Sequence, residues 1–319
     1  MGTYYCLGSV ERYLFEMSFT SNRCRIGSNF LPCKVSKLHP LYQNLDKSSP
    51  ANAPLIMGIL NITPDSFHDG SHYNTLELAV SRAQAMIEAG VDIIDVGGES
   101  TRPGAANVSE TEEIERIVPI IKKLQQFGVN ISIDTSKPAV MRAAVGAGAN
   151  MINDVRALQL EGALQTAVDL KVPVCLMHMQ GKPRGMQNAP QYQDVIEEVL
   201  AFLQRRVRVC EEAGIDRQLL SIDPGFGFGK TLKHNLIMLT YLEKFVDLGL
   251  PVLVGLSRKS MLGEMTTKPV NQRLASSLTV ALVAMQKGAR IIRVHDVDET
   301  CDVRRVYVAL EKLNREHKT

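Results

Sequence analysis

The sequence predicts an α/β protein, a (β/α)8 barrel preceded by an irregular N-terminal extension. Short apolar runs alternate with amphipathic segments eight times between residue 54 and the C-terminus, and the helix-to-strand connections are short. Eight alternations in about 260 residues fit a closed barrel. A doubly wound open sheet is the alternative, but it usually has fewer strands and a glycine-rich first crossover, and none follows Leu60.

The expected strands are short apolar runs, many of them rich in β-branched residues, as suits strands buried on both faces. They cover residues 55–60, 92–96, 130–133, 149–152, 172–177, 219–222, 251–255 and 290–294.

The expected helices have apolar residues at helical spacing, and glycines close several of them. The first presents Leu76, Ala83 and Ile87 on one face and ends at Gly90; the second opens with acidic residues that suit its dipole. They cover residues 75–89, 111–127, 138–145, 162–170, 191–213, 232–247, 271–286 and 299–314.

Residues 1–50 are expected to form a separate extension, and residues 51–319 the barrel domain. The extension lacks sustained periodicity and ends in a linker-like run, residues 47–54. Between Ser18 and Gln43 it carries four basic residues and no acid, a pattern typical of organelle transit peptides. A disordered tail, or a start codon assigned too early with Met17 as the true start, are the favoured interpretations.

The composition bounds the class of protein. Of 319 residues, 45% are hydrophobic and 22% charged, which is ordinary for a globular protein. A net charge of +2 argues against a nucleic-acid partner, and no apolar run is long enough to span a membrane. The six cysteines form no Cys-x-x-Cys pair, so we expect a reduced compartment, the cytoplasm.

Polar residues follow nearly every expected strand. In a barrel of this kind the carboxyl ends of the strands meet at one mouth, where the chemistry takes place. Convergence of so many polar side chains predicts a functional site there. The residues at or just beyond the strand ends are Asn61, Thr101, Arg102, Asp134, Asn153, Asp154, His178, Asp223, Ser257, Arg258, Lys259, Ser260, Arg293 and His295.

These residues divide into two chemical sets. Fixed acceptors and donors can read the edge of a flat heterocycle; this set is Asp134, Asn153, Asp223 and Lys259. An anion site can be built from an arginine with neighbouring donors; this set is Asn61, Arg293 and His295. Asn61 could also contact Mg²⁺ carried in by phosphates.

Several residues have simpler interpretations. Arg102 either grips a carboxylate or phosphate or is a solvated loop charge. We interpret His178 as a buried core histidine, and Asp154 as a partner of Arg156 or a cap. Asp95 and Glu99 are expected to hold their loop.

Two functional interpretations are rejected. The run Gly225–Thr231 looks like a phosphate-binding loop, but Pro224 stands where the first glycine is required, so we expect a tight glycine-rich exit. Lys259 invites a Schiff-base interpretation, yet it stands at a helix start beside Arg258, where hydrogen-bond donation is favoured.

Eight short motifs follow one another along the chain, and their order makes the set far more specific than any one of them. They are Met57–Phe67, Ile93–Gly104, Ile133–Pro138, Ile152–Asp154, Leu176–Gly181, Asp223–Lys230, Ser257–Ser260 and Ile292–Asp296. From about Pro54 to the C-terminus the chain resembles the bacterial dihydropteroate synthases of folate biosynthesis, which are TIM barrels. The extension lies outside the resemblance.

The resemblance implies a transferase. p-Aminobenzoate displaces diphosphate from 6-hydroxymethyl-7,8-dihydropterin diphosphate, giving 7,8-dihydropteroate. Mg²⁺ is the implied cofactor, a homodimer the implied assembly, and sulfonamides, which mimic p-aminobenzoate, the implied inhibitors. The alternatives are a pterin-binding methyltransferase, which has no use for a diphosphate site, and an inactive pterin-binding barrel.

The resemblance also assigns residues. The pterin is expected at Asp134, Asn153, Asp223 and Lys259, and the diphosphate with Mg²⁺ at Asn61, Arg293 and His295. Two loops and a helix start are expected to form the p-aminobenzoate site, with the residues Asp65, Ser66, Phe67, Thr101, Arg102, Pro103 and Ser260. Asp134, Asp223, Lys259 and Arg293 are the expected catalytic residues. Because an aryl amine is neutral at pH 7, we hypothesise a largely dissociative displacement without a strong base.

Overall fold

The computed structural model describes residues 23–26, 29–32, 41, 53–62, 72–99, 107–181 and 190–317. The chain divides into two compact units, residues 1–38 and residues 39–319. In the first unit, β1 (Arg23–Ile26) and β2 (Asn29–Pro32) pair in antiparallel fashion. The sequence predicted no strands there. The other residues of the extension lie outside the described part, apart from Leu41, which is buried.

The second unit contains a parallel sheet in the order β8-β7-β6-β5-β4-β3-β10-β9. A bridge between Ile222 and Val252 joins its two edges, so the strands close into a barrel. The strands are β3 (Leu55–Asn61), β4 (Ile93–Gly97), β5 (Asn130–Asp134), β6 (Met151–Asp154), β7 (Val174–Met177), β8 (Leu220–Asp223), β9 (Leu253–Val254) and β10 (Ile291–Val294). The predicted TIM barrel is confirmed.

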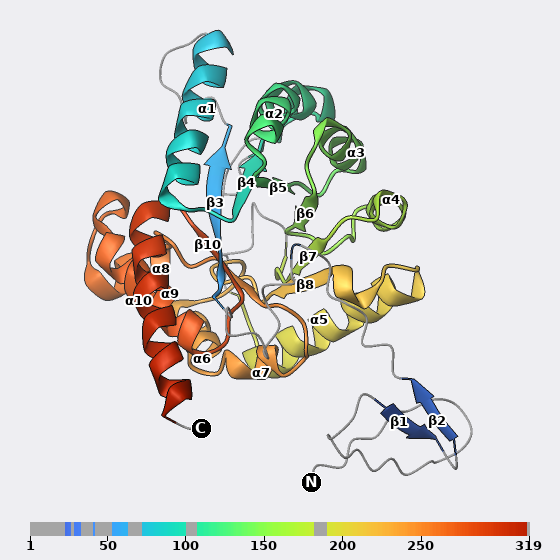
Figure 1. Ribbon diagram of the computed structural model, residues 1–319, viewed down its shortest axis with the longest axis vertical. Helices are drawn as coiled ribbons and strands as arrows, with labels where there is room; N and C mark the ends of the chain where they lie inside the picture. The colour runs from blue at the N-terminus through green and yellow to red at the C-terminus, as the bar shows by residue number, and fades with distance from the viewer. Residues whose placement is uncertain are drawn as a thin grey trace. The chain divides into compact units, whose positions relative to one another are not determined.

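Helices surround these strands, as Figure 1 shows for the second unit. The α-helices are α1 (His72–Ala89), α2 (Glu110–Leu124), α3 (Pro138–Ala147), α4 (Ala163–Leu170), α5 (Val195–Glu212), α6 (Leu232–Thr240), α7 (Glu243–Val246), α8 (Ser260–Thr266), α9 (Leu274–Gln286) and α10 (Val297–Glu316). Short 3-10 helices are η3 (Gln125–Phe127), η4 (Arg217–Leu219) and η5 (Val270–Gln272).

The burial of the strands explains the continuous apolar runs. Ile93, Ile94 and Val96 of β4 have no exposed surface, because the barrel interior lies on one side and the helices on the other. Local signals fix the helix starts: the Ser109 side chain accepts a hydrogen bond from the backbone N–H of Glu112 at the start of α2.

Two predicted elements differ from the structure. The helix expected over residues 232–247 is broken at Tyr241 into α6 and α7. For the short helix α8 only the start, at Ser260, was expected, because seven residues are too few to show a helical period.

The register of the strands places the predicted residues together. Asp134 of β5 is the partner of Asn153 on β6, and Asp95 of β4 lies between Ile59 and Ser132. These positions lie at or near the carboxyl ends of their strands, so their side chains meet at one mouth. In the part of the chain that the structure describes, no helix is both long and apolar enough to cross a membrane.

Candidate active site

Arg293, on β10, lies at the centre of the mouth. Its Nε donates to Asp95 Oδ2 at 2.6 Å, and its Nη2 donates to Asp134 Oδ2 at 2.7 Å. Asn153 Nδ2 donates to the same Asp95 oxygen at 3.1 Å. Burial lowers the pKa of Arg293, but the two carboxylates outweigh this effect and the net shift is upward. The arginine therefore stays charged and ties three strands together.

Two carboxylate oxygens at this mouth have no partner among the described residues. They are Asp95 Oδ1 and Asp134 Oδ1, and both are buried. Burial raises the pKa of Asp134 to about 7; the charge of Arg293 opposes this shift and that of Asp95 adds to it. A buried acceptor without a donor costs about 1–3 kcal/mol, so the arrangement suits a ligand that brings N–H groups.

Asp223 and Lys259 form the opposite wall of the mouth. Lys259 Nζ donates to the backbone carbonyl of Phe226 and lies 4.5 Å from the ring centre of Phe228. Burial lowers the pKa of Lys259 to about 8, although Asp223 opposes the shift. Burial raises the pKa of Asp223, with Lys259 opposing. Asp223 Oδ1 also accepts from the backbone N–H of Gly225 at 2.7 Å.

The glycine-rich run after β8 is a tight turn, as the sequence predicted. Gly225 has φ +71°, and a Cβ there would lie 1.8 Å from the carbonyl oxygen of His178, so only glycine fits. Lys230 Nζ turns back onto the carbonyls of Gly225 (2.9 Å) and Phe228 (3.0 Å). It therefore fastens its own loop and does not serve as a phosphate-binding lysine.

His178 is the buried core histidine that was expected. Its Nδ1 lies 2.9 Å from Lys230 Nζ, and burial together with that lysine lowers the pKa of His178 to about 3. Asp154 is also structural: its oxygens accept from the backbone N–H groups of Arg156 (2.8 Å) and Leu158 (2.7 Å), which confirms that it caps the following turn.

The residues expected to hold an anion approach from β3 and β10. Asn61 ends β3, and its Oδ1 is 3.4 Å from where a Cβ on Gly97 would lie. His295 Nδ1 lies 3.1 Å from Ser257 Oγ. Burial lowers the pKa of His295 to about 4, and the positive charge of Arg293 contributes, so the ring is neutral at pH 7. It can therefore donate one N–H without adding charge.

The loop that carries Lys259 is braced from both sides. Arg258, at φ +58°, pairs with Asp296 through Nε at 3.0 Å and through a second contact from Nη2. Arg273 Nη1 donates to the carbonyls of Arg258 (3.0 Å) and Lys259 (3.3 Å). Lys259 stands at the N-cap of α8, so the predicted helix start at Ser260 is confirmed. Hydrogen-bond donation by Lys259, rather than imine chemistry, agrees with this position.

Some expected site residues lie outside the described residues. These are Asp65, Ser66, Phe67, Thr101, Arg102 and Pro103. Conversely, Asp95 was expected only to hold its loop, whereas it is the principal partner of Arg293. The signal was present, because a carboxylate inside an apolar strand is rarely buried without a partner or a function.

The family model described as "Pterin binding enzyme" matches residues 57–295, nearly the whole barrel. A dihydropteroate synthase of Haemophilus influenzae is 52% identical over 270 residues, covering 84% of this chain and 98% of the relative. One from Escherichia coli K12 is 52% identical over 257 residues, covering 80% of this chain and 91% of the relative. This chain belongs to the dihydropteroate synthase family.

Solved synthases have the same fold. A Yersinia pestis dihydropteroate synthase in a sulfonamide drug complex superposes with a TM-score of 0.78 at 50% identity, covering 81% of this chain and 94% of that chain. The Xanthomonas albilineans synthase in complex with 7,8-dihydropteroate gives 0.75 at 46%, covering 82% and 94%. The predicted transferase reaction, p-aminobenzoate with 6-hydroxymethyl-7,8-dihydropterin diphosphate, is confirmed over the methyltransferase and inactive-barrel alternatives.

Proposed function

We propose that this synthase site has two neighbouring regions, one for the pterin and one for the diphosphate. The pterin binds to Asp134, Asn153, Asp223 and Lys259, and the diphosphate binds to Asn61, Arg293 and His295. The observation that carries this proposal is a pair of buried oxygens, Asp95 Oδ1 and Asp134 Oδ1, for which the described residues offer no hydrogen-bond donor. A dihydropterin carries ring N–H and amino groups that would satisfy such acceptors. We therefore add Asp95 to the pterin site.

Charge at the mouth suits a displacement in which bond cleavage runs ahead of bond formation. Asp95, Asp134 and Asp223 are three acidic groups facing two cations, Arg293 and Lys259. In the proposed step, the bond between the methylene carbon and the diphosphate oxygen breaks, and its electron pair leaves with the diphosphate. The positive charge left on the methylene spreads into the pterin ring, where the carboxylates stabilise it.

The nitrogen lone pair of p-aminobenzoate then forms the new bond to the methylene carbon. The resulting ammonium loses one proton to solvent or to the departing diphosphate. Arg293 stays protonated, because its pKa is raised, and it stabilises the negative leaving group. A strong general base is not needed for this sequence, since the attacking amine is already neutral at pH 7.

We propose that Mg²⁺ binds with the diphosphate and that Asn61 Oδ1 is a protein ligand to it. The described residues contain no group of three or more His, Cys, Asp and Glu side chains that could hold a metal. Asn61 alone would supply one protein oxygen, which fits a cation that keeps most of its waters and takes its other oxygens from the substrate. When bound, the ion would neutralise charge on the leaving diphosphate.

We propose that p-aminobenzoate binds beside the two loops that follow β3 and β4. The residues concerned are Asp65, Ser66, Phe67, Thr101, Arg102, Pro103 and Ser260. Support comes from the Xanthomonas albilineans synthase solved with 4-aminobenzoic acid and from the Yersinia pestis sulfonamide complex. We extend the proposal to inhibition of this chain by sulfonamides.

Two broader properties complete the proposal. A homodimer is supported by exposed apolar side chains on and beside the adjoining helices α6, α8 and α9, namely Leu236, Tyr241, Met265, Val270 and Leu274. A reduced, cytoplasmic location is supported by the buried free thiols of Cys175, Cys210 and Cys301.

The order of bond breaking can be tested by positional isotope exchange in the bridging oxygen of the pterin diphosphate, with Mg²⁺ and without p-aminobenzoate. Reversible cleavage predicts exchange, or slow diphosphate loss, before the amine is added. Cleavage that strictly requires p-aminobenzoate would contradict the dissociative sequence. Inactivity of an Asp95→Asn variant with an unchanged KM for the pterin substrate would remove Asp95 from the pterin site.

A further inference from the structure

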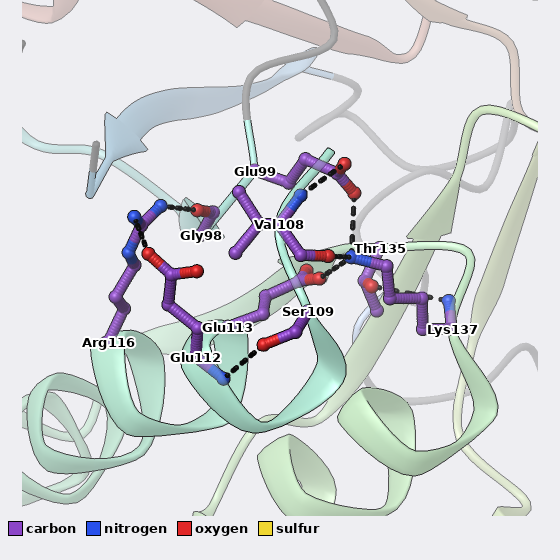
Figure 2. Close-up of polar contacts among 9 residues, drawn as sticks. All are labelled: Gly98, Glu99, Val108, Ser109, Glu112, Glu113, Arg116, Thr135 and Lys137. Carbon is purple, nitrogen blue, oxygen red and sulfur yellow. Dashed lines mark hydrogen bonds and ion pairs between the residues drawn. The ribbon is translucent and has the colours of Figure 1, made fainter. Parts of the chain in front are cut away.

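Lys137 is the centre of a partly buried ionic cluster beside the mouth (Figure 2). Its Nζ lies 2.7 Å from Glu113 Oε2, 2.9 Å from Glu99 Oε2 and 2.6 Å from the carbonyl oxygen of Val108. An ammonium has three donors, and these three acceptors match that number. We call Lys137, Glu99, Glu113 and Val108 the clasp.

The clasp joins the two ends of one loop. Glu99 directly precedes residues 100–106, and Val108 follows them after a single residue. The backbone N–H of Val108 also donates to Glu99 Oε1 at 3.2 Å. Glu99 and Val108, which flank positions 100–106, therefore both contact the same lysine.

The first turns of α2 fasten the clasp from the outer side. The Glu113 side chain is fully buried, and a Cβ on Gly98 would lie 2.8 Å from Glu113 Cγ, so the strand exit packs directly on this residue. Arg116 Nη1 donates to the carbonyl of Gly98 at 2.8 Å. The end of β4 thus has a single fixed position relative to α2.

On the inner side, Lys137 is three residues from Asp134. The backbone N–H of Lys137 donates to Thr135 Oγ1 at 3.3 Å, and α3 begins at the next residue, Pro138. The base of the ammonium-bearing side chain is therefore fixed to the strand that carries a pterin-site carboxylate. The clasp connects that strand to both ends of the loop.

Stability alone does not account for a cluster of this kind. A buried carboxylate loses hydration, and Glu113 Oε1 has no partner among the described residues. Apolar residues of similar volume often serve equally well in place of buried ion pairs. Directed hydrogen bonds, in contrast, define where two chain ends lie, which an apolar contact does less well.

We propose that Lys137 is a positioning residue for p-aminobenzoate. It acts by fixing Glu99 and Val108, the described residues on either side of positions 100–106. The lysine does not itself touch the substrates. This inference rests on the proposed role of that loop in binding p-aminobenzoate.

The test compares Lys137→Met with Arg304→Met in the full-length chain. Arg304 makes a comparable partly buried ion pair with Asp92, at the opposite end of β4. Lys137→Met is expected to raise KM for p-aminobenzoate at least tenfold while KM for the pterin diphosphate stays within twofold. Arg304→Met is expected to lower the melting temperature and leave both KM values unchanged. Lys137→Arg, which restores the charge, should recover part of the affinity.

The double variant Lys137→Met/Glu113→Leu keeps the test decisive if the single variant does not fold, since it leaves no buried carboxylate beside an apolar side chain. It should show the same selective rise in KM for p-aminobenzoate. An equal rise in both KM values, or none, would overturn the inference.

Arg102→Ala separates this inference from the proposal on which it depends. If Arg102→Ala raises KM for p-aminobenzoate and the Lys137 variants do not, only the positioning role fails. If neither raises it, the assignment of the loop to p-aminobenzoate fails as well.

Discussion

The two ends of the barrel both carry polar side chains between strands, but these side chains are hydrogen-bonded to different extents. At the amino ends, Asp92 Oδ2 accepts from the backbone N–H of Ile56 at 2.7 Å and from Arg304. Asn150 Nδ2 donates to Asn130 Oδ1 at 3.0 Å, and Asn130 Nδ2 donates to the carbonyl of Asp92 at 3.2 Å. In this series of hydrogen bonds, each of these side chains has a partner.

At the carboxyl ends, the polar network is incomplete. Asp95 and Asp134 each keep one buried oxygen without a donor among the described residues, and burial shifts the pKa of both Asp134 and Lys259 toward neutrality. A folded protein satisfies its buried polar groups where stability is the only requirement. The difference therefore separates a network that holds the barrel together from one that awaits substrate.

The largest expected effect is a contrast between alanine variants of two arginines, one at each end of the barrel. Arg293→Ala should weaken binding of the pterin diphosphate by about 2–5 kcal/mol, because it removes a mostly buried charge that we propose faces the leaving group. Arg304→Ala, at the other end, should cost about 1–3 kcal/mol of unfolding free energy and leave kinetics unchanged. Steady-state kinetics and urea denaturation of both variants measure this. Unchanged KM and turnover in Arg293→Ala would remove that residue from the site.

A second substitution tests whether the polar groups at the mouth lower the free energy of unfolding. The folded-state pKa of Asp134 is raised from 3.8 to about 7, so its burial costs free energy at pH 8; this cost decreases as the pH falls below 7, where the folded protein takes up the proton, and it disappears only below about 3.8, where the unfolded chain is protonated too. Asp134→Asn should therefore stabilise the fold at pH 8 by about 1–3 kcal/mol, less at pH 5, while kcat/KM falls at least tenfold. Destabilisation at pH 8 would show that Asp134 completes a structural network instead.

The pH dependence of the mouth should be bell-shaped. Asp134 loses its charge as the pH falls through about 7, and Lys259 loses its charge as the pH rises through about 8. kcat/KM for the pterin diphosphate should decline on both sides of this narrow range. A profile from pH 5.5 to 9.5 measures it. A flat profile would mean that neither group titrates in the free enzyme.

The smallest effect is expected at the amino ends. Asn150→Ala removes an acceptor from the backbone N–H of Ile131 (2.9 Å) and a donor to Asn130. The loss should be about 1–2 kcal/mol of unfolding free energy, with kcat and both KM values unaltered. Thermal denaturation and kinetics on one preparation measure both. A changed KM would show that the two ends are coupled.

Sequence reasoning predicted the parts of this molecule that depend on local patterns. Apolar runs located all eight barrel strands, and the rule that parallel strands end together placed Asp134, Asn153, Asp223 and Lys259 at one mouth. The same reasoning identified His178 as a buried structural residue, because it follows an apolar run and methionines stand on both sides of it.

What sequence reasoning missed depends on contacts between distant segments. Arg293 was grouped with Asn61 and His295, whereas its direct partners are Asp95 and Asp134, 198 and 159 residues away. The pairing of Lys137 with Glu113 crosses from the N-cap of α3 to α2. Neither contact follows from periodicity, because the rotation of each side chain around the barrel depends on strand register.

The closing strand sets when the site can first exist during synthesis. The strands from β3 to β8 pair in the order in which they are made, but β10 must return to β3, where Ile291 pairs with Leu55. Arg293 arrives on that strand. A nascent chain from which β10 has not yet emerged can assemble most of the barrel wall, yet it carries acidic groups at the mouth without their central cation. Closure of the barrel and the arrival of Arg293 at the mouth are therefore one event.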